Sequence, residues 1–417
     1  MHFSRRKLIL FSIVALAGLL VAAELGVRLV CWAVGRVPYT VATPWARADD
    51  ELLYVFEPNF EGRIFQNEAR INALGLRGPD VSARKGAGMK RVLCLGDSRT
   101  FGYVVAAEEA YPGVLQRLWR EQHPASRVEV LNAGRHGYTS YQGLRYLQTR
   151  GIAFQPDVVT VAFDFNDRRF VFLPEQADGP EYFAKAARGL RWRNRLSFSY
   201  LLLGFNRVMQ HVHRTDTWAQ DVLERPPEAQ RLDRLACRVE APAFEANLRA
   251  IAAFCKERGI ACVFLAMADT PVLGKAFAEA RRLREAGRPD EAAAILSRLM
   301  ASDLKPAMRD YAWPPALYET GLALEAQGRP VEAQAAFREG AHKAAFWSIM
   351  GGLLVRHTGP YLEALRRVAE TESIPVVSVD RAFADRPELF HDNCHYTAEG
   401  HRRIAELLLE CLAENRL

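Results

Sequence analysis

The chain has 417 residues, of which 49% are hydrophobic and 25% charged, and its formal net charge is +6. These values are typical of a folded globular protein and exclude extended disorder. No basic stripe interleaved with aromatic residues is present, so we expect no nucleic-acid partner. The length predicts two to three domains. Seven cysteines without a C-x-x-C pair exclude a zinc ribbon or a thioredoxin-type site, and their odd number leaves at least one thiol free.

The N-terminal segment is apolar and has a basic flank. Three basic residues at 5–7 precede an uncharged stretch at 8–23. As a helix this stretch would be about 24 Å long at ~1.5 Å per residue, slightly short of the ~30 Å core of a bilayer. The apolar character resumes over 24–34, interrupted by Arg28, which stands four residues after Glu24 and is expected to pair with it.

Four interpretations of this segment are open. It is an uncleaved single-pass anchor through residues 8–34, a signal peptide cut after Val21-Ala22-Ala23, a twin-arginine export signal at 4–8, or a buried helix of a soluble protein. We favour the anchor because the apolar run is long and continues past the cleavage site. The first three interpretations place the rest of the chain on the periplasmic side of a bacterial inner membrane.

A segment that contains four prolines, residues 37–90, leads into a series of five short apolar runs. These runs, rich in Val, Leu or Phe, are Arg91–Leu95, Val128–Asn132, Val158–Phe163, Cys262–Ala266 and Val376–Val379. Strands that are apolar on both faces belong to a parallel sheet covered by helices on both sides.

Amphipathic stretches alternate with these runs. We expect helices at Tyr111–Gln122, Tyr141–Thr149, Phe244–Arg258, Tyr361–Thr371 and Ala398–Leu412, and Gly259 is placed to cap the third of them. The alternation predicts a three-layer α/β/α fold with a doubly wound, five-stranded parallel sheet.

The predicted organisation therefore has five parts. The anchor or signal segment is 1–36, the leading segment is 37–90, the first part of the core is 91–270, a helical insertion is 271–359, and the last part of the core is 360–417. A further insertion, at about 168–238, interrupts the first part of the core and should hold a helical segment near Ser197–Val212.

The insertion at 271–359 contains an internal repeat. Residues 285–292 recur as 326–333, and the two glycines of the repeat, Gly287 and Gly328, are 41 residues apart. Helix, Gly-Arg-Pro turn and Ala-rich helix resemble a tetratricopeptide repeat, whose period is ~34, so a loop at Ser302–Trp313 should hold the excess. The repeat is either a protein-binding module over residues 276–345, a roof over the functional site, or a plain helical hairpin.

Two short segments far apart in the chain carry chemistry. Gly96-Asp97-Ser98 directly follows the first apolar run, and Asp392-Asn393-Cys394-His395 directly precedes the last helix. A serine hydroxyl is a poor nucleophile unless a base takes its proton. His395 is the histidine with an acid three residues earlier in a loop, and Asp392 is placed to hold its tautomer. The pair of segments predicts an acyl-transfer site at the carboxyl edge of the sheet.

With two further segments, these form four blocks in order. They are 96–102 (GDSRTFG), 132–140 (NAGRHGYTS), 164–167 (DFND) and 392–395 (DNCH), and Thr397, Glu399, Gly400 and His401 follow the last. The chain resembles the SGNH/GDSL hydrolase superfamily, which carries such blocks, over residues 88–168, 240–268 and 360–417. Neither insertion is covered.

The resemblance implies roles for particular residues. Ser98, Asp392 and His395 would form the catalytic triad, and the N–H groups of Ser98 and Gly137 with the amide of Asn166 would form the oxyanion hole. The third block departs from the family pattern, because Asp164 stands where glycine is usual, and this leaves the donor geometry open. We expect His136 to line the pocket and His401 to lie on the final helix, and we expect no metal and no cofactor.

The expected function is a membrane-anchored extracytoplasmic serine esterase that acts through an acyl-Ser98 intermediate. An acetylated envelope glycan, which would make it a carbohydrate O-deacetylase, and a lipid ester are both open as the ester-bearing substrate. One alternative is an O-acyltransferase in which a glycan hydroxyl replaces water. Another is a non-catalytic scaffold that recruits an envelope complex through the helical insertion. Since both insertions leave from carboxyl ends of strands, we expect them to roof the site.

Overall fold

The computed structural model describes most of the chain. The described residues are 4–34, 43–65, 67–171, 177–195, 198–205, 208, 236–303, 306–349 and 358–416. They divide into two compact units, the first made of Met1–Val55 and Phe183–Thr217 and the second of Phe56–Tyr182 and Trp218–Leu417.

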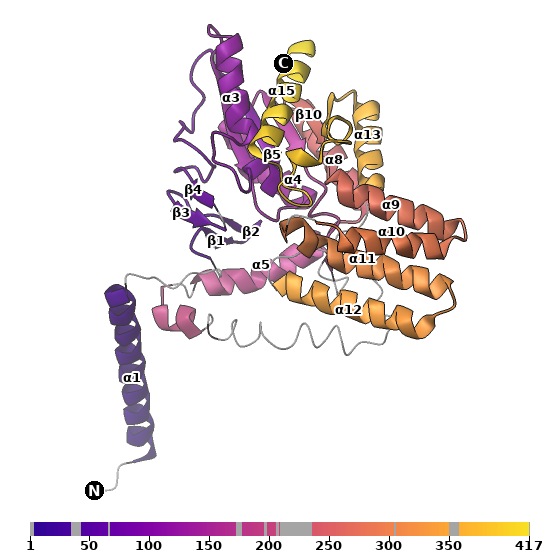
Figure 1. The fold of residues 1–417 in the computed structure, drawn as a ribbon. Helices are drawn as coiled ribbons and strands as arrows, with labels where there is room; N and C mark the ends of the chain where they lie inside the picture. The colour runs from indigo at the N-terminus through magenta and orange to yellow at the C-terminus, as the bar shows by residue number, and fades with distance from the viewer. Residues whose placement is uncertain are drawn as a thin grey trace. The chain divides into compact units, whose positions relative to one another are not determined.

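A five-stranded parallel sheet forms the centre of the second unit (Figure 1). Its strands in chain order are β5 (Lys90–Gly96), β6 (Val128–Gly134), β7 (Val158–Ala162), β10 (Ala261–Ala266) and β11 (Val376–Ser378). Their spatial order is β11-β10-β7-β5-β6. This is the flavodoxin-like order, in which the chain switches direction between β5 and β7, and ligands bind outside the carboxyl ends of the strands at that point. The predicted fold class and all five strands are confirmed.

Helices cover both faces of this sheet. On one face α3 (Tyr111–Gln122) packs against α15 (Ala398–Glu414), and on the other α4 (Ser140–Thr149), α8 (Ala241–Lys256) and α13 (Gly359–Glu372) pack together. The five expected helices are therefore confirmed to within three residues at each end. Gly259, which has a φ of 65°, follows α8 as the glycine signal predicted.

Several short elements complete the second unit. They are the antiparallel hairpin of β3 (Glu61–Ile64) and β4 (Asn67–Arg70), the pair β8 (Phe170–Val171) and β9 (Ala236–Cys237), the helices α2 (Ser98–Phe101) and α14 (Val379–Ala382), and 3₁₀ turns at Gly151–Phe154 and Pro387–Leu389. The β8–β9 pair joins the two ends of the insertion predicted at 168–238, about half of which lies outside the described residues.

The first unit contains α1 (Arg5–Val34), β1 (Ala46–Asp49), β2 (Leu53–Phe56) and most of α5 (Pro180–Arg195). By length and composition α1 could cross a membrane, and a signal sequence would pass the same test. None of its side chains is buried, so the interpretation as the buried helix of a soluble protein has no support. Of the helical segment expected near Ser197–Val212, residues 200–205 and 208 are helical, residues 198 and 199 precede the helix, and the rest lies outside the described residues.

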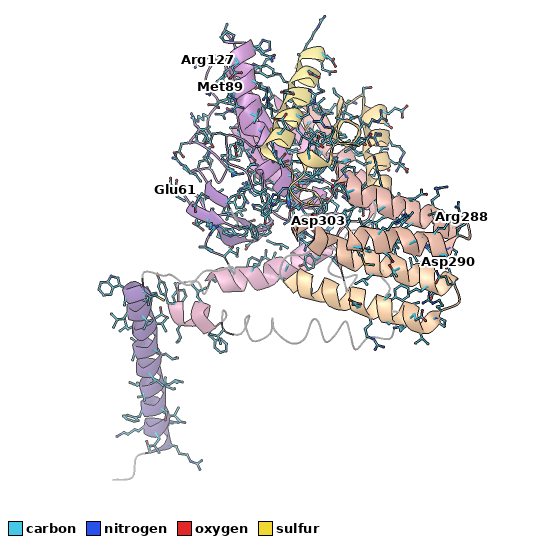
Figure 2. All side chains as sticks on the ribbon, in the orientation of Figure 1. Glu61, Met89, Arg127, Arg288, Asp290 and Asp303 are labelled. Atoms are coloured by element: carbon cyan, nitrogen blue, oxygen red, sulfur yellow. The ribbon has the colours of Figure 1, made fainter. Side chains whose placement is uncertain are left out.

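The insertion at 271–359 folds as two successive helix pairs, α9 (Pro271–Glu285) with α10 (Pro289–Ala301) and α11 (Pro306–Ala326) with α12 (Pro330–Ile349). Gly287 and Gly328, which have φ values of 74° and 73°, end α9 and α11 in the same way. Figure 2 shows Arg288 and Asp290 at the turn of the first pair, where Asp290 accepts a hydrogen bond from Gln327 of the second.

The prediction of a loop at Ser302–Trp313 is wrong. Helix α11 already begins at Pro306, and it is 21 residues long where α9 has 15. The extra residues of the second copy therefore lengthen a helix, because a helix satisfies their backbone groups internally. A protein-binding role for residues 276–345, like the predicted domain boundaries, stays a prediction.

Candidate functional site

Ser98 lies directly beyond the carboxyl end of β5, as the first residue of α2. Asp97 caps this short helix by accepting a hydrogen bond from the N–H of Arg99 at 2.9 Å. The turn requires glycine at position 96, because a Cβ there would meet the carbonyl oxygen of Ala162 on β7 at 2.8 Å. The backbone can therefore turn sharply where β5 ends and present Ser98 at the sheet edge.

His395 and Asp392 reach Ser98 from the loop between β11 and α15. Nε2 of His395 lies 2.8 Å from Oγ of Ser98, and Nδ1 of His395 lies 2.7 Å from Oδ2 of Asp392. The other carboxylate oxygen of Asp392 accepts hydrogen bonds from the N–H groups of Cys394 and His395, at 3.0 and 2.8 Å. A continuous chain of hydrogen bonds thus joins the two distant sequence segments.

The environment of Asp392 keeps it ionised. Burial by itself raises the pKa of this carboxyl, but the imidazole of His395 and the two backbone N–H groups outweigh burial, and the net pKa is lowered. A carboxylate at this position accepts the Nδ1 hydrogen of His395, which leaves Nε2 as the acceptor facing Ser98.

The loop after β6 brings Gly137 to the same edge. Because Gly96 pairs with Gly134 and Ala162 across the sheet, residues shortly after these three positions converge. Gly137 has a φ of 72°, which glycine adopts without strain. The side-chain amide of Asn166 lies against this loop and donates to the carbonyl oxygen of Tyr138 at 3.1 Å.

Arg238 fixes the Gly137 loop from the other side. Its guanidinium donates to the carbonyl oxygen of Gly137 at 2.7 Å and to Oδ2 of Asp178 at 2.6 Å. Asp178 in turn accepts a hydrogen bond from the hydroxyl of Thr139 at 2.7 Å. The loop that carries Gly137 is therefore held by Asn166 on one side and, on the other, by half-buried Arg238, which is paired with the buried carboxylate of Asp178.

Comparison with known proteins agrees with this geometry. Residues 94–300 match the model of the GDSL-like lipase/acylhydrolase family, and this range contains Ser98, Gly137 and Asn166. Over this range the chain belongs to this family. The resemblance to the SGNH/GDSL superfamily, stated from the four sequence blocks, is confirmed.

A curated relative is the enzyme of Escherichia coli named thioesterase 1/protease 1/lysophospholipase L1. It is 35% identical over 94 residues, which are 22% of this chain and 43% of the relative. The chain therefore spans less than half of the length of the curated relative that it matches.

Solved structures are also similar. A lipase/acylhydrolase from Enterococcus faecalis covers 78% of this chain and 97% of its own length at 14% identity, with a TM-score of 0.36. An acetyl xylan esterase from Geobacillus stearothermophilus covers 77% of this chain and 93% of its own length at 13% identity, with a TM-score of 0.37. Because both scores lie below 0.5, family membership rests on the family model and the sequence match.

Asp164, which replaces the usual family glycine, is neutralised by two arginines. Its carboxylate forms ion pairs with Arg99 and, at 3.2 Å, with Arg168, and it accepts a hydrogen bond from the hydroxyl of Thr358 at 3.1 Å. Burial alone would raise the pKa of Asp164, but the two guanidinium groups outweigh burial and lower it. The extra carboxylate is thus a fixed anion with partners of its own.

Asp167, the last residue of the same block, is buried and holds Ser140 at the start of α4. The N–H and the hydroxyl of Ser140 both donate to its carboxylate. Burial raises the pKa of Asp167 to about 8, although these two hydrogen bonds lower it. Asp167 therefore organises the backbone just after Gly137 and makes no contact with Ser98 among the described hydrogen bonds.

Tyr103 lies against His395, and Phe65 lies against Tyr103. The ring of Tyr103 lies 4.3 Å from the imidazole of His395, centroid to centroid, and 5.8 Å from the ring of Phe65. Phe65 is 54% exposed, and His136 packs against both aromatic residues. His136 therefore lies next to the site as predicted. Burial lowers its pKa well below the usual value, and His395 and two arginines lower it further.

The helical insertion begins and ends at this edge of the sheet. Thr270, at its start, donates its N–H to the carbonyl oxygen of Asn393 at 2.9 Å, and Thr358, at its end, donates to Asp164. Phe170, shortly after Asn166, packs with Tyr318 and Phe337 of the insertion. The insertion is therefore not on the opposite edge of the sheet, and its role as a roof over Ser98 stays a prediction.

His401 and the group of Asp392, Cys394 and His395 are two further places where a ligand or metal site could be considered. His401 lies on α15 as expected and is buried, where its Nδ1 accepts the N–H of Tyr111 at 3.3 Å. Donor atoms of Asp392, Cys394 and His395 lie within 4.8 Å of one another, a spacing that a metal ion could use. Burial raises the pKa of Cys394 well above its usual value, which keeps this thiol protonated and a poor ligand. All seven cysteines are described and free.

Sequence reasoning missed Arg238, Tyr103 and Phe65. Arg238 follows a long insertion and has no motif around it, so only the folded chain brings it to Gly137. Tyr103 directly follows the first block, and its position there is a signal that could have found it.

Proposed function

We propose that the protein is a membrane-anchored, extracytoplasmic serine esterase. The observation that carries the proposal is the chain of hydrogen bonds from Ser98 through His395 to Asp392, at 2.8 and 2.7 Å. A serine hydroxyl hydrogen-bonded to an imidazole that a buried carboxylate orients is the arrangement that activates serine for attack on an ester.

In the first half of the reaction, Oγ of Ser98 attacks the ester carbonyl carbon while its proton passes to Nε2 of His395. The tetrahedral intermediate then loses the alcohol, which takes the proton from His395, and an acyl-Ser98 ester remains. In the second half, water gives a proton to His395 and attacks the acyl group, and the second tetrahedral intermediate expels Oγ of Ser98, which takes the proton back from His395 as the carboxylic acid is released. Asp392 stabilises the imidazolium in both halves without taking the proton.

The negative charge on the carbonyl oxygen needs hydrogen-bond donors. We assign this role to the N–H groups of Ser98 and Gly137 and to the amide of Asn166. Removal of one such donor costs about 2.7–4 kcal/mol of transition-state stabilisation. Asn166 and Arg238, which hold the Gly137 loop from its two sides and are called the clamp below, support the assignment, because donors must be held in place before the charge develops.

The N-terminal helix α1 supports the anchor. Its 30 residues are enough to span a bilayer with some tilt, and the basic residues at 5–7 favour an N-terminus in the cytoplasm. Intact-mass measurement of the protein from a membrane fraction tests this proposal. Retention of residue 1 supports the anchor, and a mature N-terminus near residue 24 would show that the segment is a cleaved signal.

For the substrate, we propose an O-acetylated glycan. The rings of Tyr103 and Phe65 extend from His395 toward solvent as an aromatic surface. Aromatic faces suit the apolar C–H face of a sugar ring, and ligand sites combine such surfaces with a few polar groups. A small acetyl group would then reach Ser98 while the sugar lies on the two rings.

Hydrolysis of p-nitrophenyl acetate by the purified full-length protein tests the esterase. We expect turnover that Ser98→Ala abolishes, and a covalent fluorophosphonate adduct on Ser98 that the variant lacks. Equal rates for both proteins would overturn the proposal and favour a scaffold. If acylation of an added glycan outpaces hydrolysis, the protein is instead an O-acyltransferase.

The substrate is tested separately with Phe65→Ala. We expect a higher KM for an acetylated oligosaccharide and an unchanged rate with p-nitrophenyl acetate, which is too small to use the outer ring. Val331→Ala, at an exposed apolar side chain of α12, is the matched control. Equal KM values for wild type and Phe65→Ala would contradict a glycan on this surface.

A further inference from the structure

An exposed apolar segment lies in the first unit, far in sequence from α1. Phe198 is 70% exposed and Phe205 is 63% exposed, and Leu202 and Val208 are exposed as well. Residues 200–205 are helical, so positions 202 and 205, three residues apart, fall on one side of the helix, and Phe198 lies two residues before its start. Neighbouring exposed side chains of this size mark an interaction site, since soluble surfaces rarely gather them.

Glu24 of α1 binds the start of this segment. Its carboxylate accepts hydrogen bonds from the hydroxyl of Ser199 at 2.8 Å and from the N–H groups of Tyr200 and Leu201 at 2.9 and 3.0 Å. These N–H groups begin a helix and have no partner within it, so a carboxylate is a favourable cap. Figure 1 shows this short helix, in pink, beside α1.

Arg28 completes the connection. It pairs with Glu24 at 2.7 Å, donates to the carbonyl oxygen of Phe198, and lies over the ring of Tyr200 at 4.4 Å. Glu24 and Arg28, the two charged residues that interrupt the apolar run of α1, therefore pair with each other and also bind residues 198–201. Placing an ionisable side chain of a membrane helix in the bilayer costs free energy, so such a side chain usually has a specific partner. The partner of Glu24 and Arg28 is the segment that begins at Phe198.

The position of the pair along α1 sets its depth. Glu24 lies sixteen residues after Leu8, which is about 24 Å along the helix at ~1.5 Å per residue. If the basic residues at 5–7 mark the cytoplasmic boundary, Glu24 and Arg28 lie close to the outer boundary of a hydrocarbon core of ~30 Å. A segment bound there is at the level of the lipid headgroups on the extracytoplasmic side.

A basic stripe leads into the apolar segment. Lys185, Arg188, Arg191 and Arg195 of α5 are all exposed. Their spacings of three, three and four residues place them on one face of the helix. Basic side chains next to an apolar segment are the pattern of elements that lie on anionic bilayers.

We propose that residues 198–205 form a second membrane element, which lies in the outer interface of the bilayer, docked on α1 through Glu24 and Arg28, with the basic stripe of α5 on the anionic headgroups. This inference rests on the anchor part of the proposed function, because it requires α1 to remain in the membrane. It does not depend on the esterase activity.

Site-specific photo-crosslinking to lipid tests the proposal. The full chain, with p-benzoylphenylalanine in place of Leu202 or Phe205, is reconstituted in vesicles of phosphatidylethanolamine and phosphatidylglycerol. The same replacement at Leu16 of α1 is the positive control. The same replacement at Val331, which is 82% exposed on α12, is the negative control. After illumination, mass spectrometry detects lipid adducts.

We expect adducts at positions 16, 202 and 205 and at least tenfold fewer at 331. Adducts at 16 alone would overturn the second membrane element and leave the anchor intact, whereas adducts at none of the positions would overturn both. Equal adduct yields at positions 205 and 331 would show that lipid reacts with any exposed side chain of the protein, and this result would also overturn the proposal. Hydrolysis of p-nitrophenyl acetate by the same vesicles reports separately on the esterase.

Two further comparisons test the contacts themselves. Glu24→Ala removes the cap on residues 199–201, so the yield at Phe205 should fall severalfold while the yield at Leu16 is unchanged. Replacing phosphatidylglycerol with phosphatidylcholine should likewise lower the yield at Phe205 through loss of the attraction to α5. An unchanged yield in the first comparison would refute docking through Glu24, and in the second it would refute the role of the basic stripe.

Discussion

Substitution of Arg238 tests how far catalysis depends on the clamp around Gly137. The guanidinium is shared between the carbonyl oxygen of Gly137 at 2.7 Å and the buried carboxylate of Asp178 at 2.6 Å. A lysine keeps the charge beside Asp178 but lacks the planar fork that reaches both acceptors at once. Arg238→Lys should therefore release Gly137 while it keeps Asp178 paired.

The expected magnitude follows from these contacts. Complete loss of one oxyanion donor lowers kcat about 10²–10³-fold. Arg238 holds the donor loop without being the donor, and Asn166 still binds the neighbouring carbonyl, so we expect a smaller fall of about 10–30-fold, or ~1.4–2 kcal/mol. Arg238→Gln should also lose about 3–5 kcal/mol of unfolding free energy, because Asp178 is only 2% exposed and would lose its charge partner.

Steady-state kinetics with p-nitrophenyl acetate and thermal unfolding separate the two effects. Arg238→Lys should lower kcat with little change in KM or Tm. Asp178→Asn is the matched control, since it breaks the ion pair and leaves the contact between Arg238 and Gly137, and it should lower Tm more than kcat. Wild-type kcat in Arg238→Lys, or equal losses of kcat in Asp178→Asn and Arg238→Lys, would refute a positioning role for Arg238.

Three further predictions concern the triad, the core and the serine turn. Asp392→Asn should lower kcat about 10⁴-fold, because the amide favours the wrong tautomer of His395, and a loss below tenfold would contradict the triad. His401 has a pKa lowered to about 3, first by burial, so the unfolded chain takes up the proton below pH ~6.5 and this histidine alone should contribute a loss of about 2 kcal/mol of unfolding free energy between pH 7.5 and 5. His401→Asn, which keeps an acceptor for Tyr111, should remove this loss in urea titrations, and an unchanged pH dependence would contradict the assignment. Gly96→Ala should abolish hydrolysis and lower Tm, since its Cβ would meet backbone at 2.8 Å, and wild-type activity would show that the turn tolerates a side chain.

Much of the fold could be predicted because its signals are local. Each core strand is an uninterrupted apolar run, and the core helices show apolar spacings of three and four with recognisable ends. The site was equally visible at its two ends, because Ser98 follows a strand and the Asp392–His395 loop precedes a helix. The same reasoning failed for the second helix pair of the insertion, where the expected loop is part of α11.

The sequence by itself determined the order of strands and helices and the family, and it indicated the residues proposed as nucleophile, base and orienting acid. Only the tertiary structure decided that Asp164 is neutralised by Arg99 and Arg168, that Arg238 holds Gly137, and that Glu24 binds residues 199–201. The physical reason is the distance in sequence between the partners. An apolar run or a helix cap is an interaction among neighbours, whereas an ion pair or a backbone contact between distant segments exists only after the chain has packed.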